Sequence, residues 1–195
     1  MRLCCQGPSL VVHTPAKLNL FLEVLGRRPD GYHELETVIV SIGLYDTLLF
    51  SEEGSQQTRF GCRLALSQPL AQQQRGNLSG EDNLVVRAAA LLREATGCRR
   101  GVRIELIKRI PLQAGLGGGS SDAAATLVGL NRFWDLQLPS AELHELAARL
   151  GSDVNFFLDS PRAAVCTGRG EQIAPLAGAT RLHFVVACPA SGLST

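Results

Sequence analysis

A cluster of glycines that leads directly into a helix is the feature that most constrains this chain. Residues 111–122 read Pro-Leu-Gln-Ala-Gly-Leu-Gly-Gly-Gly-Ser-Ser-Asp, and the segment that follows is rich in alanine and leucine. Glycines allow positive φ angles and a close approach of the backbone to a ligand, while the free N–H groups and positive dipole end of a helix attract anions. We therefore expect a phosphate-binding loop with a nucleotide as its ligand.

Two familiar phosphate loops do not fit this segment. A Walker loop requires a lysine directly after its last glycine, and no lysine follows these glycines. A dinucleotide loop has the spacing G-x-G-x-x-G in a strand–helix–strand unit, but Ser120 stands at the last glycine position and the helix leads to another helix. The simple alternative is a glycine-rich surface turn with Ser120 or Ser121 as a helix cap, although capping does not require four glycines.

Length and composition favour one compact domain with a small-molecule partner. The chain has 195 residues and 45% hydrophobic content, which suits one core and is short for two. Nineteen basic and eighteen acidic residues argue against a nucleic-acid or membrane-surface partner. The six cysteines lack the spacing of a metal site and are expected to be free thiols. We expect a protein of the cytoplasm, or of the plastid stroma in a plant. The oligomeric state does not follow from the sequence.

Hydrophobic patterning predicts a sheet in the first half and helices in the second. Helices are expected at 84–96, with Asp82 or Asn83 as the cap, at 121–133 and at 140–150. A turn-rich loop is expected at 26–33. Strands are expected at 10–14, 18–25, 35–44, 47–50, 59–66, 102–108, 163–167 and 182–187. This pattern is typical of an α+β domain.

The glycine segment resembles the P-x-x-x-G-L-G-x-x-S-S loop of the GHMP kinases. Further family segments recur in order: Pro-Ala-Lys-Leu-Asn-Leu-Phe-Leu at 15–22, Arg-Pro-Asp-Gly-Tyr-His-Glu-Leu at 28–35, Glu-Asp-Asn-Leu-Val-Val at 81–86 and Gly-Ser-Asp-Val at 151–154. The resemblance implies a ribosomal protein S5 domain 2-like fold, with a mostly antiparallel sheet and helices on one face. It also implies that residues 1–195 are the N-terminal, ATP-binding and catalytic domain, and that the family's C-terminal domain is absent from this chain.

By this resemblance, ATP binds at the glycine loop as a co-substrate. Asn83 would lie at the adenine end, although a role as a helix cap explains it equally well. Asp122 is expected in the first turn of the following helix, where its carboxylate interacts favourably with the helix dipole, rather than as a metal ligand. Mg²⁺ would therefore be carried by ATP, and no protein side chain would ligate it. The implied loop residues are Pro111, Leu112, Gln113, Ala114, Gly115, Leu116, Gly117, Gly118, Gly119, Ser120 and Ser121.

The same resemblance makes Lys17 and Asp153 the catalytic pair. Phosphoryl transfer requires an oriented nucleophile and compensation of negative charge, and an aspartate and a lysine provide both. A carboxylate beside a cation is a weak base, which favours orientation and late proton acceptance for Asp153. Without the flanking motifs, a surface ion pair would be the simpler interpretation of these two residues.

The acceptor would be a cytidine-diphosphate-linked polyol. Tyr32 and His33 match the family's cytidine site, where a ring stacks on the base, and Asn19 would share a strand face with Lys17 and contact the methylerythritol portion. A Tyr-His pair in a loop is otherwise common surface packing. The implied reaction is ATP-dependent phosphorylation of a tertiary 2-hydroxyl in isoprenoid precursor biosynthesis. The alternatives are a truncated nucleotide-binding module with impaired catalysis and another GHMP kinase that acts on homoserine or mevalonate.

Overall fold

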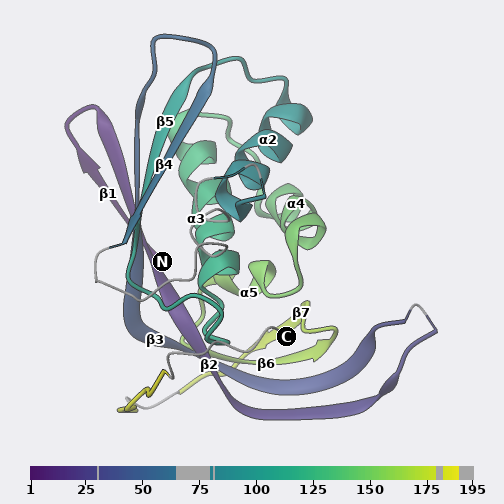
Figure 1. The fold of residues 1–195 in the computed structure, drawn as a ribbon. Helices are drawn as coiled ribbons and strands as arrows, with labels where there is room; N and C mark the ends of the chain where they lie inside the picture. The colour runs from purple at the N-terminus through teal and green to yellow at the C-terminus, as the bar shows by residue number, and fades with distance from the viewer. Residues whose placement is uncertain (30, 65–79, 81, 179–181, 189–195) are drawn as a thin grey trace.

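The computed structural model describes residues 1–29, 31–64, 80, 82–178 and 182–188. Within these residues, seven strands form one sheet, and four helices cover one of its faces (Figure 1). The strands are β1 (Arg2–Gln6), β2 (Ser9–Arg27), β3 (His33–Glu52), β4 (Thr58–Leu64), β5 (Val102–Lys108), β6 (Ala163–Gly168) and β7 (Gln172–Pro175). The helices are α2 (Leu84–Thr96), α3 (Gly118–Phe133), α4 (Ser140–Leu150) and α5 (Val154–Asp159).

The sheet is organised around β3, which is long enough to pair with three strands. Most of its length, residues 33–50, pairs with β2, its last part pairs with β5 and its first part pairs with β6. Every pairing is antiparallel except that of β4 with β5. These two strands are parallel, and α2 lies between them along the chain. The predicted α+β class, with a mostly antiparallel sheet and helices on one face, is confirmed.

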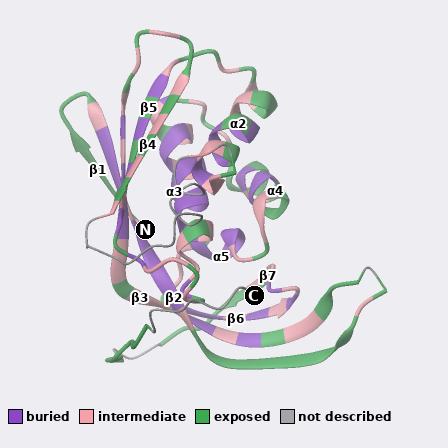
Figure 2. Cartoon of the chain, in the orientation of Figure 1, coloured by how far each residue is buried: buried purple, intermediate pink, exposed green. Residues whose placement is uncertain are grey.

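The β2–β3 hairpin divides into a buried half and an exposed half (Figure 2). Residues 10–12 and 14–17 of β2 are buried beneath the helices, whereas residues 19–27 are exposed on an arm that projects from the body. Bulges between Pro15 and Ala16, Asn19 and Phe21, and Val24 and Gly26 allow the strand to bend. Proline has no backbone N–H to donate to a neighbouring strand. The bulge after Pro15 explains how this residue can lie inside a long strand.

The main core lies between the sheet and the helices. Alternating residues of β5 point inward, and α2 and α3 bury apolar faces against them. A second, small core holds the glycine loop onto β2: Ala16, Ile110 and Leu116 are buried there, with Leu18, Ile42, Leu44 and Ala114 packed around them. The loop therefore has apolar anchors of its own.

The structure confirms many predicted elements and corrects others. The boundaries of α2, α4 and β5 agree with the prediction. The predicted strands 10–14 and 18–25 are one strand, as are 35–44 and 47–50, because bulges absorb the irregular pattern between them. The loop expected at 26–33 shrinks to the turn between Arg27 and His33. Residues 65–66 of the strand predicted at 59–66 lie outside the described residues.

Three further differences concern the second half and the N-terminus. The helix predicted from Ser121 begins at Gly118, so the last glycines form its first turn. Helix α5 and strands β1 and β7 were not predicted. The strand predicted at 182–187 is wrong: these residues carry no strand assignment, because an apolar run becomes a strand only where another strand supplies its hydrogen bonds. No helix of the described residues is long and apolar enough to cross a membrane.

Candidate active site

Lys17 lies where β2 passes beneath the glycine loop. Its backbone N–H donates to the carbonyl of Leu116 at 3.0 Å, which joins the strand to the loop. Its side chain is only 10% exposed, and its Nζ lies 3.3 Å from Oδ2 of Asp153. The same Nζ donates to Oδ1 of Asn19 at 2.6 Å, so the two side chains share a strand face as predicted. The structure thus brings together the predicted catalytic pair and one predicted acceptor residue.

Asp153 lies far from Lys17 in the sequence, and the fold brings the two side chains together. It stands just before α5, and its side chain makes no hydrogen bond that caps this helix. The carboxylate is 32% exposed, so it is available both to the lysine and to a ligand. Cys166 lies under this pair, and burial raises the pKa of its thiol to about 11, with Asp153 adding to the shift and Lys17 opposing it. This thiol is therefore neutral at physiological pH.

Backbone conformation shapes the glycine loop. Gln113, Gly115 and Gly117 all have positive φ, at 53°, 70° and 69°. At Gly117 a side chain would also collide, since a Cβ there would lie 2.8 Å from Cγ of Lys17 and 2.9 Å from the ring of Phe157. Glycine is required at this position by both conformation and space. The loop can approach the lysine closely only because this residue has no side chain.

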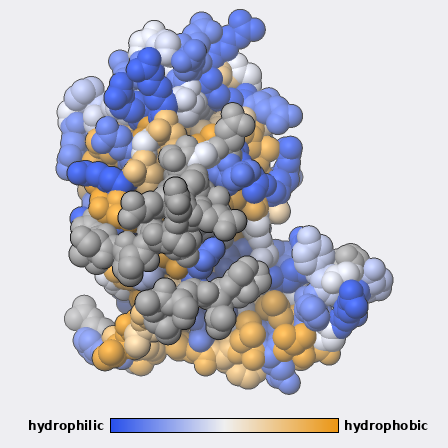
Figure 3. Space-filling model, viewed as in Figure 1, coloured by the Kyte–Doolittle hydropathy of each residue, from blue (hydrophilic) through white to orange (hydrophobic). Residues whose placement is uncertain are grey.

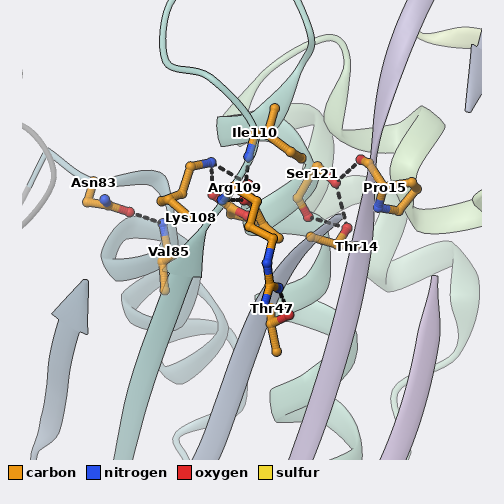
Figure 4. Close-up of polar contacts among 11 residues, drawn as sticks. Thr14, Pro15, Thr47, Asn83, Val85, Lys108, Arg109, Ile110 and Ser121 are labelled. Atoms are coloured by element: carbon orange, nitrogen blue, oxygen red, sulfur yellow. Dashed lines mark hydrogen bonds and ion pairs between the residues drawn. The ribbon is translucent and has the colours of Figure 1, made fainter. Parts of the chain in front are cut away.

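The first turn of α3 faces the end of this loop. Its earliest N–H groups have no acceptor within the helix, which is the arrangement that attracts anions. Ser121 is wholly buried in this turn, and its hydroxyl donates to the carbonyl of Pro15 at 2.6 Å and contacts the hydroxyl of Thr14 at 2.5 Å (Figure 4). The side chain of Ser121 therefore holds α3 onto β2, while Gly119 and Ser120 remain more accessible.

A buried ionic cluster lies below the loop, and sequence reasoning missed two of its members. Nζ of Lys108 lies 2.5 Å from Oδ2 of Asp46 and 2.8 Å from Oδ2 of Asp122. All three residues are at most 3% exposed. One signal was present in the sequence: Lys17 and Lys108 are its only lysines, and Lys108 stands three residues before the loop. The expectation that Asp122 lies in the first turn of its helix is wrong, because α3 begins four residues earlier.

Asn83, Tyr32 and His33 lie at the margins of the candidate site. Asn83 precedes α2, and its Oδ1 accepts from the N–H of Val85 at 2.9 Å, so the capping alternative is confirmed. Tyr32 is 56% exposed in the turn at the tip of the arm, and the guanidinium of Arg169 lies 4.8 Å from its ring centroid. His33, also exposed, begins β3 and pairs with Arg27. The tip lies well away from the glycine loop, and β6 and β7 run between them (Figure 1).

Arg169 connects the hairpin tip with the catalytic pair. It belongs to the turn between β6 and β7, next to Gly170, where a Cβ would lie 3.9 Å from Oδ1 of Asp153. Its backbone N–H donates to Glu171, which holds this turn. The turn between β6 and β7 thus lies beside both the ring predicted to stack on cytidine, through Arg169, and the predicted catalytic carboxylate, through Gly170. The sequence interpretation gave this arginine no role.

The described residues contain no group of three or more His, Cys, Asp and Glu side chains that could hold a metal ion.

A hollow of about 1010 Å³ lies away from the candidate site, between β3 and residues 182–186. Its lining includes Leu20, Ile42 and Phe184 but no predicted site residue. Figure 3 shows apolar side chains gathered along the lower part of the view. The candidate site and this hollow share no residue and are therefore distinct features.

Comparisons with known proteins show which proteins this chain is similar to. Residues 83–161 match the model of the GHMP kinases N terminal domain. The chain is 48% identical over 191 residues to a 4-diphosphocytidyl-2-C-methyl-D-erythritol kinase of Delftia acidovorans, covering 94% of this chain and 61% of that protein. It is 51% identical over 174 residues to a protein of the same name from Symbiobacterium thermophilum, covering 89% and 57%. The chain therefore spans about three fifths of these curated relatives.

Solved structures show the same likeness. A crystal structure of 4-(cytidine 5'-diphospho)-2C-methyl-D-erythritol kinase matches with a TM-score of 0.69 and 42% identity, covering 86% of this chain and 55% of that one. Methanococcus jannaschii mevalonate kinase matches with a TM-score of 0.66 at 18% identity, covering 89% and 57%, which supports the fold alone. The fold predicted from the sequence resemblance is confirmed.

Proposed function

We propose that this chain is a member of the GHMP kinase family and carries the ATP-binding and phosphoryl-transfer part of a 4-diphosphocytidyl-2-C-methyl-D-erythritol kinase. The observation that carries this proposal is the contact of Lys17 with both Asp153 and the glycine loop. Residues from three distant segments meet there, and the names of relatives at 48% and 51% identity supply the reaction.

ATP would bind with its phosphates against the loop 111–121 and the start of α3. The N–H groups of Gly118, Gly119 and Ser120 are the natural partners of phosphate oxygens, since the helix offers them no acceptor. Mg²⁺ would accompany these phosphates and neutralise part of their charge. The side chain of Asn83 caps α2. This residue would therefore lie near the adenine end without using that side chain to bind the base.

In the transfer step, the 2-hydroxyl oxygen of the acceptor would form a bond to the γ-phosphorus as the bond to the β,γ-bridging oxygen breaks. Asp153 would orient the hydroxyl and take its proton late, while Lys17 would balance charge on the transferring oxygens. Asn19 also accepts a hydrogen bond from this lysine, at 2.6 Å, which helps to hold its ammonium group. A tertiary alcohol is a crowded nucleophile, so this alignment would provide much of the rate enhancement.

The cytidine end of the acceptor would lie along the hairpin arm. The exposed ring of Tyr32 offers a stacking face, and His33 beside it offers a donor and an acceptor. Arg169 lies over the tyrosine ring and near the catalytic turn, where a guanidinium suits the acceptor's diphosphate. The acceptor would thus extend from the arm's tip toward Asp153.

A coupled assay of ADP formation by the 195-residue chain tests the proposal. We expect turnover with ATP and 4-diphosphocytidyl-2-C-methyl-D-erythritol, and none above background with homoserine or mevalonate as the acceptor. Turnover with homoserine or mevalonate instead would contradict the proposed substrate and favour another kinase of the family.

A second candidate function is a nucleotide-binding module without catalysis. The exposure of the arm favours it, because residues 19–27 leave the acceptor side open to water. Calorimetric titration with ATP, run beside the turnover assay, separates the two functions. Binding without turnover would support the module, and clear turnover would exclude it.

A further inference from the structure

Asp46 connects the sheet to the entrance of the glycine loop. It is wholly buried on β3, and its Oδ1 accepts from the backbone N–H groups of Arg109 at 2.5 Å and Ile110 at 2.9 Å. Its Oδ2 accepts from Nζ of Lys108 at 2.5 Å. A single carboxylate therefore fixes Lys108, Arg109 and Ile110, the three residues that lead from β5 into the loop and that Figure 4 labels.

Lys108 extends this connection to the other end of the loop. Besides Asp46, its Nζ donates to Oδ2 of Asp122 at 2.8 Å, within the second turn of α3. The same Nζ lies directly below the start of this helix, 3.0 Å from where a Cβ on Gly118 would stand. The chain leaves the sheet at Lys108 and returns to the same ammonium group at Asp122. The whole glycine loop lies between these two points.

Stability alone gives a poor reason for such a cluster. Desolvation of three ionisable groups is costly, and buried ion pairs are often no more stabilising than apolar residues of the same size. Burial lowers the pKa of Lys108, but the ionised forms of Asp122 and Asp46 outweigh this effect and raise the pKa above its usual value, so the lysine is charged. Burial also raises the pKa of Asp122 to about 8, so below that pH this residue accepts from the lysine as a neutral carboxyl group. Oδ1 of Asp122 is buried without a hydrogen-bond partner, which adds to the cost. A geometric role explains why these groups are buried together.

We propose that Asp46, Lys108 and Asp122 form a positioning device that holds both ends of the glycine loop in the geometry that binds the phosphates of ATP. This inference rests on the proposed function of the loop. Backbone amides stabilise phosphate charge only when their positions are set before the ligand arrives, because reorganising them would consume binding energy. The cluster sets the loop's entrance through the amides of residues 109 and 110 and its exit through Asp122.

Calorimetric titration of the 195-residue chain with ATP tests this device. Asp46→Asn places a neutral amide beside the ammonium group of Lys108. Lys108→Met removes the hydrogen bonds to both Asp46 and Asp122. We expect each to weaken ATP binding by at least about tenfold, the effect of losing one charge-assisted hydrogen bond. Asp122→Ala, which removes only the link to α3, is expected to weaken binding similarly. Asp122→Asn keeps an oxygen for the lysine and is expected to restore binding to within about threefold of wild type.

The matched control is Leu92→Ala, a core change in α2 that lies outside the cluster. Such a change leaves a cavity in the core, so it lowers the melting temperature as a cluster variant would. We expect its ATP affinity to stay within about twofold of wild type. If Leu92→Ala weakens binding as much as Asp122→Ala does, or if Asp122→Ala binds as wild type does, the device is overturned. A wild-type chain that does not bind ATP would instead overturn the proposed function, and the device with it.

Discussion

The nucleotide side and the acceptor side of the candidate site are built in opposite ways. The glycine loop rests on a small apolar core and is tied to the sheet by buried hydrogen bonds and ion pairs at both ends. The hairpin arm, by contrast, exposes residues 19–27 on one strand and 31–33 at its tip. Both sides belong to the same pair of strands, since β2 and β3 run from under the loop to the end of the arm.

This difference indicates how the two ligands would be recognised. A phosphate site made of backbone amides requires a rigid loop, and the buried network provides that rigidity. A base that stacks on an aromatic ring requires only an accessible face, which an exposed hairpin turn can offer. Changes on the nucleotide side should therefore alter both folding and ATP affinity, whereas changes on the arm should alter acceptor affinity alone.

The largest expected effect lies where the two sides meet. Asp153→Asn keeps the size of the side chain but removes its charge, so both the pairing with Lys17 and proton acceptance are lost. We expect turnover to fall by about a thousandfold, within the range for a removed general base. The coupled assay at saturating ATP measures it. Asp135→Asn, at an exposed position outside the site, is the control and should leave turnover unchanged. Near-wild-type turnover by Asp153→Asn would remove this residue from the catalytic role.

A pair of glycine substitutions tests the rigidity of the nucleotide side. Gly115 and Gly117 have nearly the same φ, but a Cβ meets nothing within 4 Å at Gly115 and collides with Lys17 and Phe157 at Gly117. Both alanine variants should carry a conformational cost of about 1–2 kcal/mol. Gly117→Ala should lose about 2 kcal/mol more through overpacking and bind ATP more weakly. Denaturant unfolding and ATP titration measure these effects, and equal losses for the two variants would contradict the close approach.

The acceptor side is tested by Tyr32→Leu. Loss of a stacking ring should raise the KM for the acceptor by about tenfold, since one base on an aromatic ring contributes about 1–3 kcal/mol. The KM for ATP should not change. Tyr45→Leu is the matched control. The guanidinium carbon of Arg2 lies 5.6 Å from the ring centroid of Tyr45, so this tyrosine also contacts an arginine, but it does not belong to the arm. A rise in the KM for ATP with Tyr32→Leu would show that the two sides are not independent.

The last expected effect concerns pH and acts on stability rather than on a ligand. Burial raises the pKa of Asp122 to about 8, with Lys108 opposing the shift and Asp46 adding to it. Because the folded protein holds this proton more tightly than the unfolded chain, the contribution to stability is complete below about pH 4 and is lost as pH rises through about 8. Between pH 6 and 8 we expect the free energy of unfolding to fall by up to about 1.4 kcal/mol per pH unit. Asp122→Asn cannot titrate and should flatten this slope. An equal slope in both proteins, measured by urea unfolding, would contradict the assignment.

Much of the fold could be predicted because its signals are local. The stripe of apolar residues and the capping Asn83 define α2, and the alternation of residues 102–108 defines β5. The start of α3 was misplaced because glycines are poor helix formers, and only the contacts of the loop make Gly118 helical. Residues 182–187 have the composition of a strand, yet a strand exists only where another strand pairs with it.

The candidate site divides in the same way. The sequence by itself determined the chemical character of the loop and, through family resemblance, the choice of Lys17 and Asp153, because these depend on residue type and local order. The tertiary structure alone decided that Asp46 and Lys108 meet Asp122 and that Arg169 lies over Tyr32, since the partners come from distant segments. Hydrogen bonds and ion pairs form between groups that are close in space, and only the packed fold sets those distances.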